Sequence, residues 1–190
     1  MMSIIQNARR LASDAHESIK QKRKYTNEPY IHHPERVAQL VASVEHDHNM
    51  IAAAWLHDVI EDVYPINNEY DIHLIATETN YHVARLVIEL TDVSKPEDGN
   101  RAARKAIDRQ KLAAASDKAK TIKLADLIDN TRDICTHDKK FAKIYLEEKA
   151  LLLPLLTRGN NVLYQFCKYM LDASKNSLMV NDKVNYEQVD

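Results

Sequence analysis

The sequence predicts an all-α protein, folded as one helical bundle of about eight to ten helices. Only two glycines and five prolines occur in 190 residues, and hydrophobic residues make up 45 % of the chain. The alternation of apolar and polar residues that is typical of strands is scarce, whereas apolar residues recur three and four positions apart. We therefore expect a single domain over residues 1–174, followed by a polar tail over residues 175–190.

The first helix is predicted over about residues 3 to 22. Apolar residues at helical spacing, among them Ile4, Leu11 and Ala15, would form its buried face. The segment from Arg23 to Tyr30 is polar and is expected to be a loop.

The second helix is expected from Pro34 to about Val44, because the fixed φ angle and missing N–H of proline are tolerated in a first turn. His33 would then lie directly before the helix. Asp47 or Asn49 is suited to cap the third helix, which should end where Val-Tyr-Pro-Ile-Asn-Asn follows.

The rest of the chain shows the same helical periodicity, interrupted by one loop. Residues 94–100, which contain a proline and a glycine, should be the most flexible internal stretch. Further helices are predicted at about 70–78, 81–93, 101–115, 117–134, 139–157 and 160–174.

Charge and composition exclude several classes of protein. A formal net charge of −2 gives no general attraction to nucleic acid, and no apolar run reaches the roughly 18 residues that a membrane span needs. Cys135 and Cys167 have no CxxC spacing, and no secretory leader is recognisable, so we expect free thiols in the cytoplasm. A homo-oligomer is left open.

The most unusual segment runs from Ala52 to Asp62 and reads Ala-Ala-Ala-Trp-Leu-His-Asp-Val-Ile-Glu-Asp. An apolar helix carries four ionisable groups here, and burying such groups unpaired costs on the order of several kcal/mol each. On an α-helix, Glu61 would lie one turn beyond both His57 and Asp58, and Asp62 one turn beyond Asp58. We therefore expect a divalent metal ion to compensate these charges.

Two other stretches also embed ionisable residues in apolar sequence, namely Tyr30-Ile-His-His-Pro and Ile122-Lys-Leu-Ala-Asp. If the helices bring the three stretches together, the ligands would be two imidazoles and two carboxylates, from His33, His57, Asp58 and Asp126. This mixture suits Mn²⁺, Zn²⁺ or Fe²⁺ better than Ca²⁺ or Mg²⁺, and leaves positions open for catalysis. Alternatively, Asp126 only pairs with Lys123 at i−3.

A local basic cluster lies between residues 101 and 123. Arg101, Arg104, Lys105 and Arg109 recur at helical spacing, and Lys123 follows on the next helix. These side chains are suited to clamp phosphate groups, although a solvated helix face would show the same pattern.

The chain resembles the HD-domain phosphohydrolases, in particular the small alarmone hydrolases related to the hydrolase domain of the Rel/SpoT enzymes. The resemblance spans about residues 3 to 170. Four strings carry it: Glu28-Pro-Tyr-Ile-His-His-Pro-Glu-Arg-Val-Ala, Ala53-Ala-Trp-Leu-His-Asp-Val-Ile-Glu-Asp, Leu90-Thr-Asp-Val-Ser and Ile122-Lys-Leu-Ala-Asp-Leu-Ile-Asp-Asn-Thr-Arg.

The resemblance implies a role for each matching residue. It implies Mn²⁺ as the usual metal and the same four ligands as above, and it places Glu61 and Asp62 beside the attacking water. Arg23, with Lys24 as a close rival, would stack on guanine. Asn130 would lie near the sugar, and Tyr145 would contact the substrate.

The implied reaction is hydrolysis of the 3′-pyrophosphate of guanosine 3′,5′-bis-polyphosphates, (p)ppGpp, to GDP or GTP and pyrophosphate. The alternatives are an NADPH 2′-phosphatase or other nucleotide phosphohydrolase of the HD class, a catalytically silent nucleotide-binding HD module, and a helical partner-binding scaffold. We expect Asp129 to face solvent or cap locally. His32 should be a helix cap or a surface residue. Five other histidines should lie at the surface: His46, His48, His73, His82 and His137.

Overall fold

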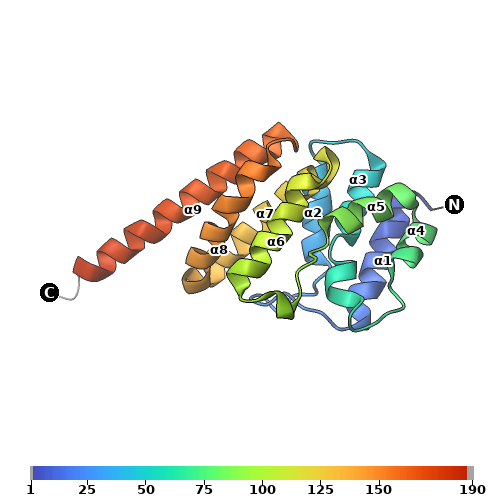
Figure 1. Cartoon of the computed structure of the whole chain (residues 1–190), viewed down its shortest axis with the longest axis horizontal. Helices are drawn as coiled ribbons and strands as arrows, with labels where there is room; N and C mark the ends of the chain where they lie inside the picture. Colours follow the sequence, from blue (N-terminus) through green and yellow to red (C-terminus); the bar gives the residue numbers. More distant parts are fainter. Residues whose placement is uncertain (1, 188–190) are drawn as a thin grey trace.

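The computed structural model describes residues 2–187, with side chains through residue 179, and this part of the chain contains helices but no strands. The predicted all-α fold is therefore confirmed (Figure 1). The α-helices are α1 (Ile4–Ser18), α2 (His32–Ala42), α3 (His48–Leu56), α4 (Ile72–Glu78), α5 (Tyr81–Leu90), α6 (Arg101–Ala114), α7 (Asp117–His137), α8 (Lys139–Leu152) and α9 (Asn161–Glu187). Three short elements join them: the π-helix η1 (Val59–Val63) and the 3₁₀ helices η2 (Pro96–Asp98) and η3 (Leu153–Leu156).

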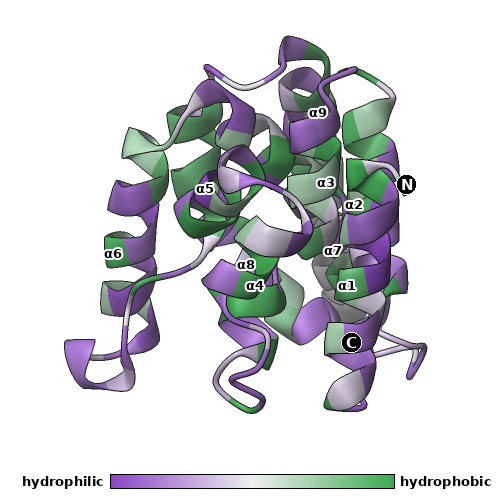
Figure 2. Ribbon diagram, turned by 90° about the vertical axis from the view of Figure 1, so that its right-hand side faces the viewer, coloured by the Kyte–Doolittle hydropathy of each residue, from purple (hydrophilic) through white to green (hydrophobic). Residues whose placement is uncertain are grey.

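Helix α7 lies at the centre of the bundle and packs against α2, α8 and α9, while α3 packs against α1, α2 and α5. The buried residues Ile122, Leu124 and Leu127 supply the core face of α7. Burying a large aliphatic side chain contributes about 1.5–3 kcal/mol. Figure 2 shows that α6, at the edge of the bundle, is largely hydrophilic. Within the described residues, no helix is long and apolar enough to cross a membrane.

Polar residues define most helix starts by accepting hydrogen bonds from backbone N–H groups in the first turn. Asp47 accepts from the N–H of Asn49 at 2.8 Å, so it is the cap of the two candidates. Each such cap stabilises its helix by about 1 kcal/mol. Similar side-chain caps are Ser3, Asp71, Asn80, Asn100, Ser116 and Asp138.

Several predicted helix ends are wrong. Helix α1 ends at Ser18 rather than near residue 22, and Lys20 takes a left-handed φ of 51°. Helix α2 begins at His32, so His33 lies inside its first turn rather than before it. Helix α9 continues to Glu187 instead of ending near residue 174, so the tail predicted from residue 175 is helical where it is described. The domain boundary at residue 174 stays a prediction.

Gly159 lies where η3 turns into α9, directly against α7. A Cβ atom at this position would lie 2.8 Å from Leu124 Cδ1 and 3.0 Å from the backbone nitrogen of Thr121. We expect Gly159→Ala to lower the free energy of unfolding by about 1–3 kcal/mol, because a close-packed backbone cannot move away cheaply. Urea unfolding measures this. Thr157→Ala, at an exposed position nearby, is the control, and equal stability of both variants would contradict the tight contact.

Candidate metal centre

The structure brings all four predicted ligands together at the point where α2, the end of α3 and α7 meet. His33 Nε2 lies 3.5 Å from Asp58 Oδ2 and 3.3 Å from Asp126 Oδ1. His57 Nε2 lies 3.1 and 3.8 Å from the same two atoms. All four residues except Asp58 are almost fully buried. Two imidazole nitrogens and two carboxylates therefore face one small volume.

The tautomers of the two histidines fit a metal ion. His57 Nδ1 lies 2.8 Å from the carbonyl oxygen of Ala54, which can only accept, so Nδ1 carries the proton. His33 Nδ1 lies 2.7 Å from the carboxylate of Asp129 and donates likewise. Both Nε2 atoms are buried and have no hydrogen-bond partner within the described chain. Ligand atoms of His33, His57 and Asp58 lie within 4.8 Å of one another, so these residues can hold a cation.

The electrostatics of the centre also favour a cation. Burial opposes ionisation of Asp58, but the adjacent imidazole of His57 outweighs it and holds the pKa of that carboxyl well below its usual range. Burial likewise opposes a charge on His57, yet the carboxylates of Asp58 and Asp126 raise its pKa well above the ordinary value. The site thus concentrates negative charge where the two Nε2 atoms point.

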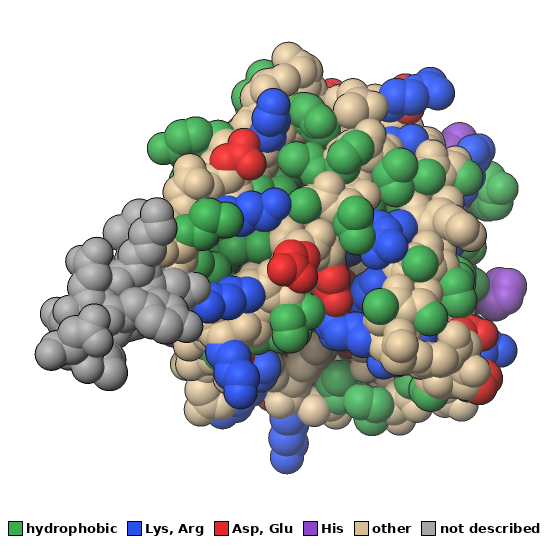
Figure 3. All heavy atoms as spheres, turned by 60° about the vertical axis from the view of Figure 1, so that its left-hand side comes forward, with side chains coloured by type: hydrophobic (Ala, Val, Ile, Leu, Met, Phe, Trp, Pro, Cys, Tyr) green, Lys and Arg blue, Asp and Glu red, His purple; other side chains and the backbone are tan. Residues whose placement is uncertain are grey.

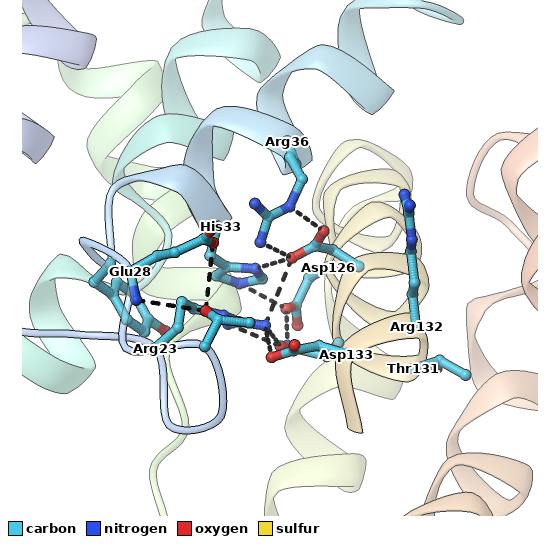
Figure 4. Close-up of polar contacts among 12 residues, drawn as sticks. Arg23, Glu28, His33, Arg36, Asp126, Thr131, Arg132 and Asp133 are labelled. Atoms are coloured by element: carbon cyan, nitrogen blue, oxygen red, sulfur yellow. Dashed lines mark hydrogen bonds and ion pairs between the residues drawn. The ribbon is translucent and has the colours of Figure 1, made fainter. Parts of the chain in front are cut away.

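The prediction that Asp129 faces solvent is wrong. Its carboxylate is buried and accepts hydrogen bonds from His33 and from Arg36, whose Nε and Nη2 lie 2.6 and 3.2 Å away. Figure 4 shows Arg36 and His33 approaching α7 from the same side. Asp129 lies one turn after Asp126, and that spacing could have identified it. A carboxylate that fixes a histidine in this way is typical of metal sites.

Three further polar residues at the site were missed in the sequence. The Tyr30 hydroxyl donates to Asp58 Oδ2 at 2.7 Å, and Gln21 Nε2 donates to Asp62 Oδ2 at 2.8 Å. The buried ring of His16 lies 2.6 Å from Gln21 Oε1. Tyr30 belongs to one of the unusual ionisable strings, whereas nothing in the sequence singles out Gln21 or His16.

The backbone around Glu61 and Asp62 differs from the predicted α-helix. Helix α3 ends at Leu56, and Val59–Val63 form a π-helix, so the α-helical spacing assumed for Glu61 and Asp62 is wrong. Glu61 accepts a hydrogen bond from the backbone N–H of Asp92 at 3.2 Å, whereas Asp62 reaches Gln21 on the α1 side. A π-helical turn of this kind often marks a functional site.

Both carboxyl groups have raised pKa values. Partial desolvation by the surrounding protein, together with the nearby carboxylates of Asp92 and Asp58, raises the pKa of the solvent-accessible Glu61 to about 7. Burial and the charge of Asp58 raise the pKa of Asp62 to about 6. Carboxylates with such values can exchange protons near neutral pH.

The predicted nucleoside contacts Arg23 and Asn130 lie around the turn of α7 that follows Asp126. Arg23 is buried, forms an ion pair with Asp133 at 2.7 Å and donates to Asn130 Oδ1 at 3.3 Å (Figure 4). Asn130 Nδ2 in turn donates to Asp126 Oδ1 at 2.5 Å. Lys24 is 70 % exposed and lies over the rings of Tyr25 and Phe141.

The predicted basic clamp is only partly assembled at the centre. Arg101 points to α8, where it forms a bidentate ion pair with Glu148. Arg104 is partly buried, and its Nε has no hydrogen-bond partner in the part of the chain that the structure describes. Arg109 and Lys123 line a cleft beside the centre. Lys123 Nζ lies 2.7 Å from Asp126 Oδ2, so Asp126 both pairs with lysine and faces the histidines.

Tyr145, the other predicted substrate contact, is buried and shares a hydrogen bond with Thr131.

The chain is similar in sequence to one protein family and to several proteins of known name. Residues 8–158 match the family described as HD domain. A probable guanosine-3′,5′-bis(diphosphate) 3′-pyrophosphohydrolase of Synechocystis sp. is 37 % identical over 73 % of this chain, and the corresponding enzyme of Aquifex aeolicus is 36 % identical over 81 %. The chain spans only about a fifth of the length of these relatives, 18 % and 21 %.

A similar fold is found in a solved structure described as a metazoan ortholog of SpoT that hydrolyzes ppGpp. The TM-score is 0.79, the sequence identity is 24 %, and the match covers 91 % of this chain and 96 % of the other. At this identity the likeness supports the all-α fold.

Proposed function

Since this chain belongs to the HD-domain family, we propose that it is a metal-dependent hydrolase that removes the 3′-pyrophosphate of (p)ppGpp, giving GDP or GTP and pyrophosphate. The observation that carries the proposal is the pair of buried Nε2 atoms, on His33 and His57, that face two carboxylates and have no hydrogen-bond partner among the described residues. Relatives named for this reaction share more than a third of the aligned residues. We expect the protein to act on this nucleotide in the cytoplasm.

His33, His57, Asp58 and Asp126 would hold the ion, with Mn²⁺ proposed and Zn²⁺ or Fe²⁺ as alternatives. When bound, such an ion lowers the pKa of a water from about 15.7 towards 7 and polarises a phosphoryl oxygen. In the proposed reaction, the oxygen of a water molecule would bond to the phosphorus attached to the 3′ oxygen, and the bond between that phosphorus and the 3′ oxygen would break. Pyrophosphate leaves with the new oxygen, and the 3′ oxygen is protonated.

Glu61 is our choice for the group that takes the proton from the attacking water. Its pKa of about 7 suits a base at neutral pH, and the N–H of Asp92 holds one of its oxygens. Asp62 is fixed by Gln21 and is assigned a positioning role at the site.

The contacts of the loop before α2 favour Lys24 over Arg23 as the residue that meets the base. Arg23 could stack on guanine only by giving up its ion pair with Asp133 and its hydrogen bonds to Asn130, whereas Lys24 is exposed. Asn130 remains our choice for the sugar, and the contact of Tyr145 with substrate stays a prediction.

Asp129 should set the metal affinity through His33. We expect Asp129→Asn to weaken Mn²⁺ binding by about 10- to 100-fold, the usual effect of disturbing a carboxylate that orients a ligating histidine. Calorimetric titration with Mn²⁺ measures this, and circular dichroism checks that the helices remain. Asp117→Asn, at the exposed start of the same helix, is the matched control. Unchanged affinity in Asp129→Asn would remove this role.

Product analysis tests the proposed reaction. Purified protein with Mn²⁺ should release pyrophosphate from ppGpp and pppGpp, and chelation should stop the release. Faster release of phosphate from NADPH would favour the 2′-phosphatase. Binding of nucleotides without turnover would favour a catalytically silent nucleotide-binding module. A melting temperature that does not change on chelation would favour a partner-binding scaffold.

A further inference from the structure

A cleft beside the metal centre, between α6, α7 and α8, is lined by four basic and three acidic side chains. Lysine and arginine side chains also spread over the face of the molecule shown in Figure 3, with acidic side chains between some of them. The cleft holds about 30 Å³, room for a water molecule or single phosphoryl oxygens rather than for a whole nucleotide. Its lining residues with charged side chains are Asp92, Lys105, Asp108, Arg109, Lys123, Glu148 and Lys149.

Lys149 and Arg109 are the two basic members of this group that form no ion pair within the described side chains. Lys105 pairs with Asp92 at 2.6 Å and Lys123 with Asp126 at 2.7 Å, but Lys149 forms no ion pair or hydrogen bond within the described side chains. Its Nζ instead lies 5.0 Å from the centroid of the Tyr145 ring. Burial and the ammonium of Lys123 lower the pKa of Lys149 to about 8. A half-buried ammonium beside two others is unfavourable unless an anion joins them.

The cleft lies on one side of the metal centre and the nucleoside contacts on the other. Along α7, Lys123 precedes Asp126 by one turn and Asn130 follows it by one turn, so all three share a face. Asp92, at the rim of the cleft, donates its N–H to Glu61. A ligand that spans the centre therefore passes from Asn130 across Asp126 to the lysines.

We propose that Lys149, together with Lys105 and Lys123, binds the terminal phosphoryl group of a substrate 3′-pyrophosphate. The proposal rests on the proposed function and assigns the residues that would select pyrophosphate esters over phosphomonoesters. The phosphorus that is attacked lies at the metal centre, and only oxygens of the second phosphoryl group enter the small cleft. Ammonium groups bind such oxygens by charge-assisted hydrogen bonds.

Calorimetric titration with inorganic pyrophosphate and with orthophosphate, both at the same free Mn²⁺ concentration, tests this. Wild-type protein should bind pyrophosphate more tightly than orthophosphate. Lys149→Met, which keeps the apolar stem over Tyr145, should weaken pyrophosphate binding by about ten-fold or more, the usual effect of losing a hydrogen bond to a charged group, and leave orthophosphate binding unchanged. Lys140→Met removes an exposed lysine from the same helix and should change neither affinity.

Lys105→Met is the second variant and should show the same selective loss of pyrophosphate binding. It keeps the test decisive if Lys149→Met does not fold. Equal weakening of both anions, or no weakening of either, overturns the proposal. The titrations contain no nucleotide and need no turnover, so they report on the cleft even if (p)ppGpp is not hydrolysed. Conversely, (p)ppGpp hydrolysis with unselective anion binding would overturn only the role of the cleft.

Discussion

Asp58→Ala abolishes metal binding and hydrolysis together. Asp58 Oδ2 lies close to both of the proposed ligand nitrogens, 3.5 Å from His33 Nε2 and 3.1 Å from His57 Nε2. Without this carboxylate, the two Nε2 atoms face only the carboxylate of Asp126 among the described residues. We expect Mn²⁺ affinity to fall by more than about 100-fold, beyond the usual effect of changing a residue that only supports a ligand.

Calorimetric titration with Mn²⁺ and an assay for released pyrophosphate measure the two effects on the same preparation. Asp14→Ala is the control, because Asp14 is an exposed aspartate that forms only a surface pair with Arg10. Circular dichroism shows whether the bundle persists, since the Tyr30 hydroxyl also loses its acceptor. An Asp58→Ala protein that still hydrolyses substrate would reject the assignment of this ligand.

Glu61→Gln keeps the metal and slows turnover by about two to four decades, the usual scale for loss of a general base. The amide preserves the size of the side chain and can still accept the hydrogen bond from Asp92 N–H, but it cannot take a proton. Metal affinity should therefore stay close to that of the wild type while kcat falls. Single-turnover kinetics at saturating Mn²⁺ separate the two quantities.

Glu69→Gln, an exposed substitution of the same chemistry, should leave kcat unchanged. Asp62→Asn should slow turnover less than Glu61→Gln, because Asp62 is engaged with Gln21. If Glu61→Gln loses Mn²⁺ along with activity, Glu61 is a ligand and its role as the base is wrong. If Asp62→Asn shows the larger loss, the two roles are exchanged.

The fold could be predicted because its determinants are local. Apolar spacing in α1 and α5 and the cap at Asp47 are readable from neighbouring residues. Helix ends were less predictable, since the turn after Ser18 depends on Lys20 adopting a positive φ. The π-helix at Val59–Val63 was missed because i, i+3 and i, i+4 spacing in sequence looks the same whether or not the backbone widens by one residue.

Candidate ligands such as His57 and Asp126 were found because they interrupt apolar sequence. Residues that support them were missed because the contact is made by tertiary packing. Asp129 and His33 are 96 positions apart, and their hydrogen bond depends on α2 lying across α7. Lys149 likewise looks like an ordinary polar residue of an amphipathic helix, and its position beside Lys123 arises only when α6, α7 and α8 form the cleft.

The central claim is that two imidazoles and two carboxylates from α2, α3 and α7 bind one divalent ion. Crystals grown with Mn²⁺ and measured at the manganese absorption edge test it most directly. The account predicts one strong anomalous peak in contact with His33, His57, Asp58 and Asp126. A well-ordered crystal with no peak there, or with a peak held by other residues, would contradict it.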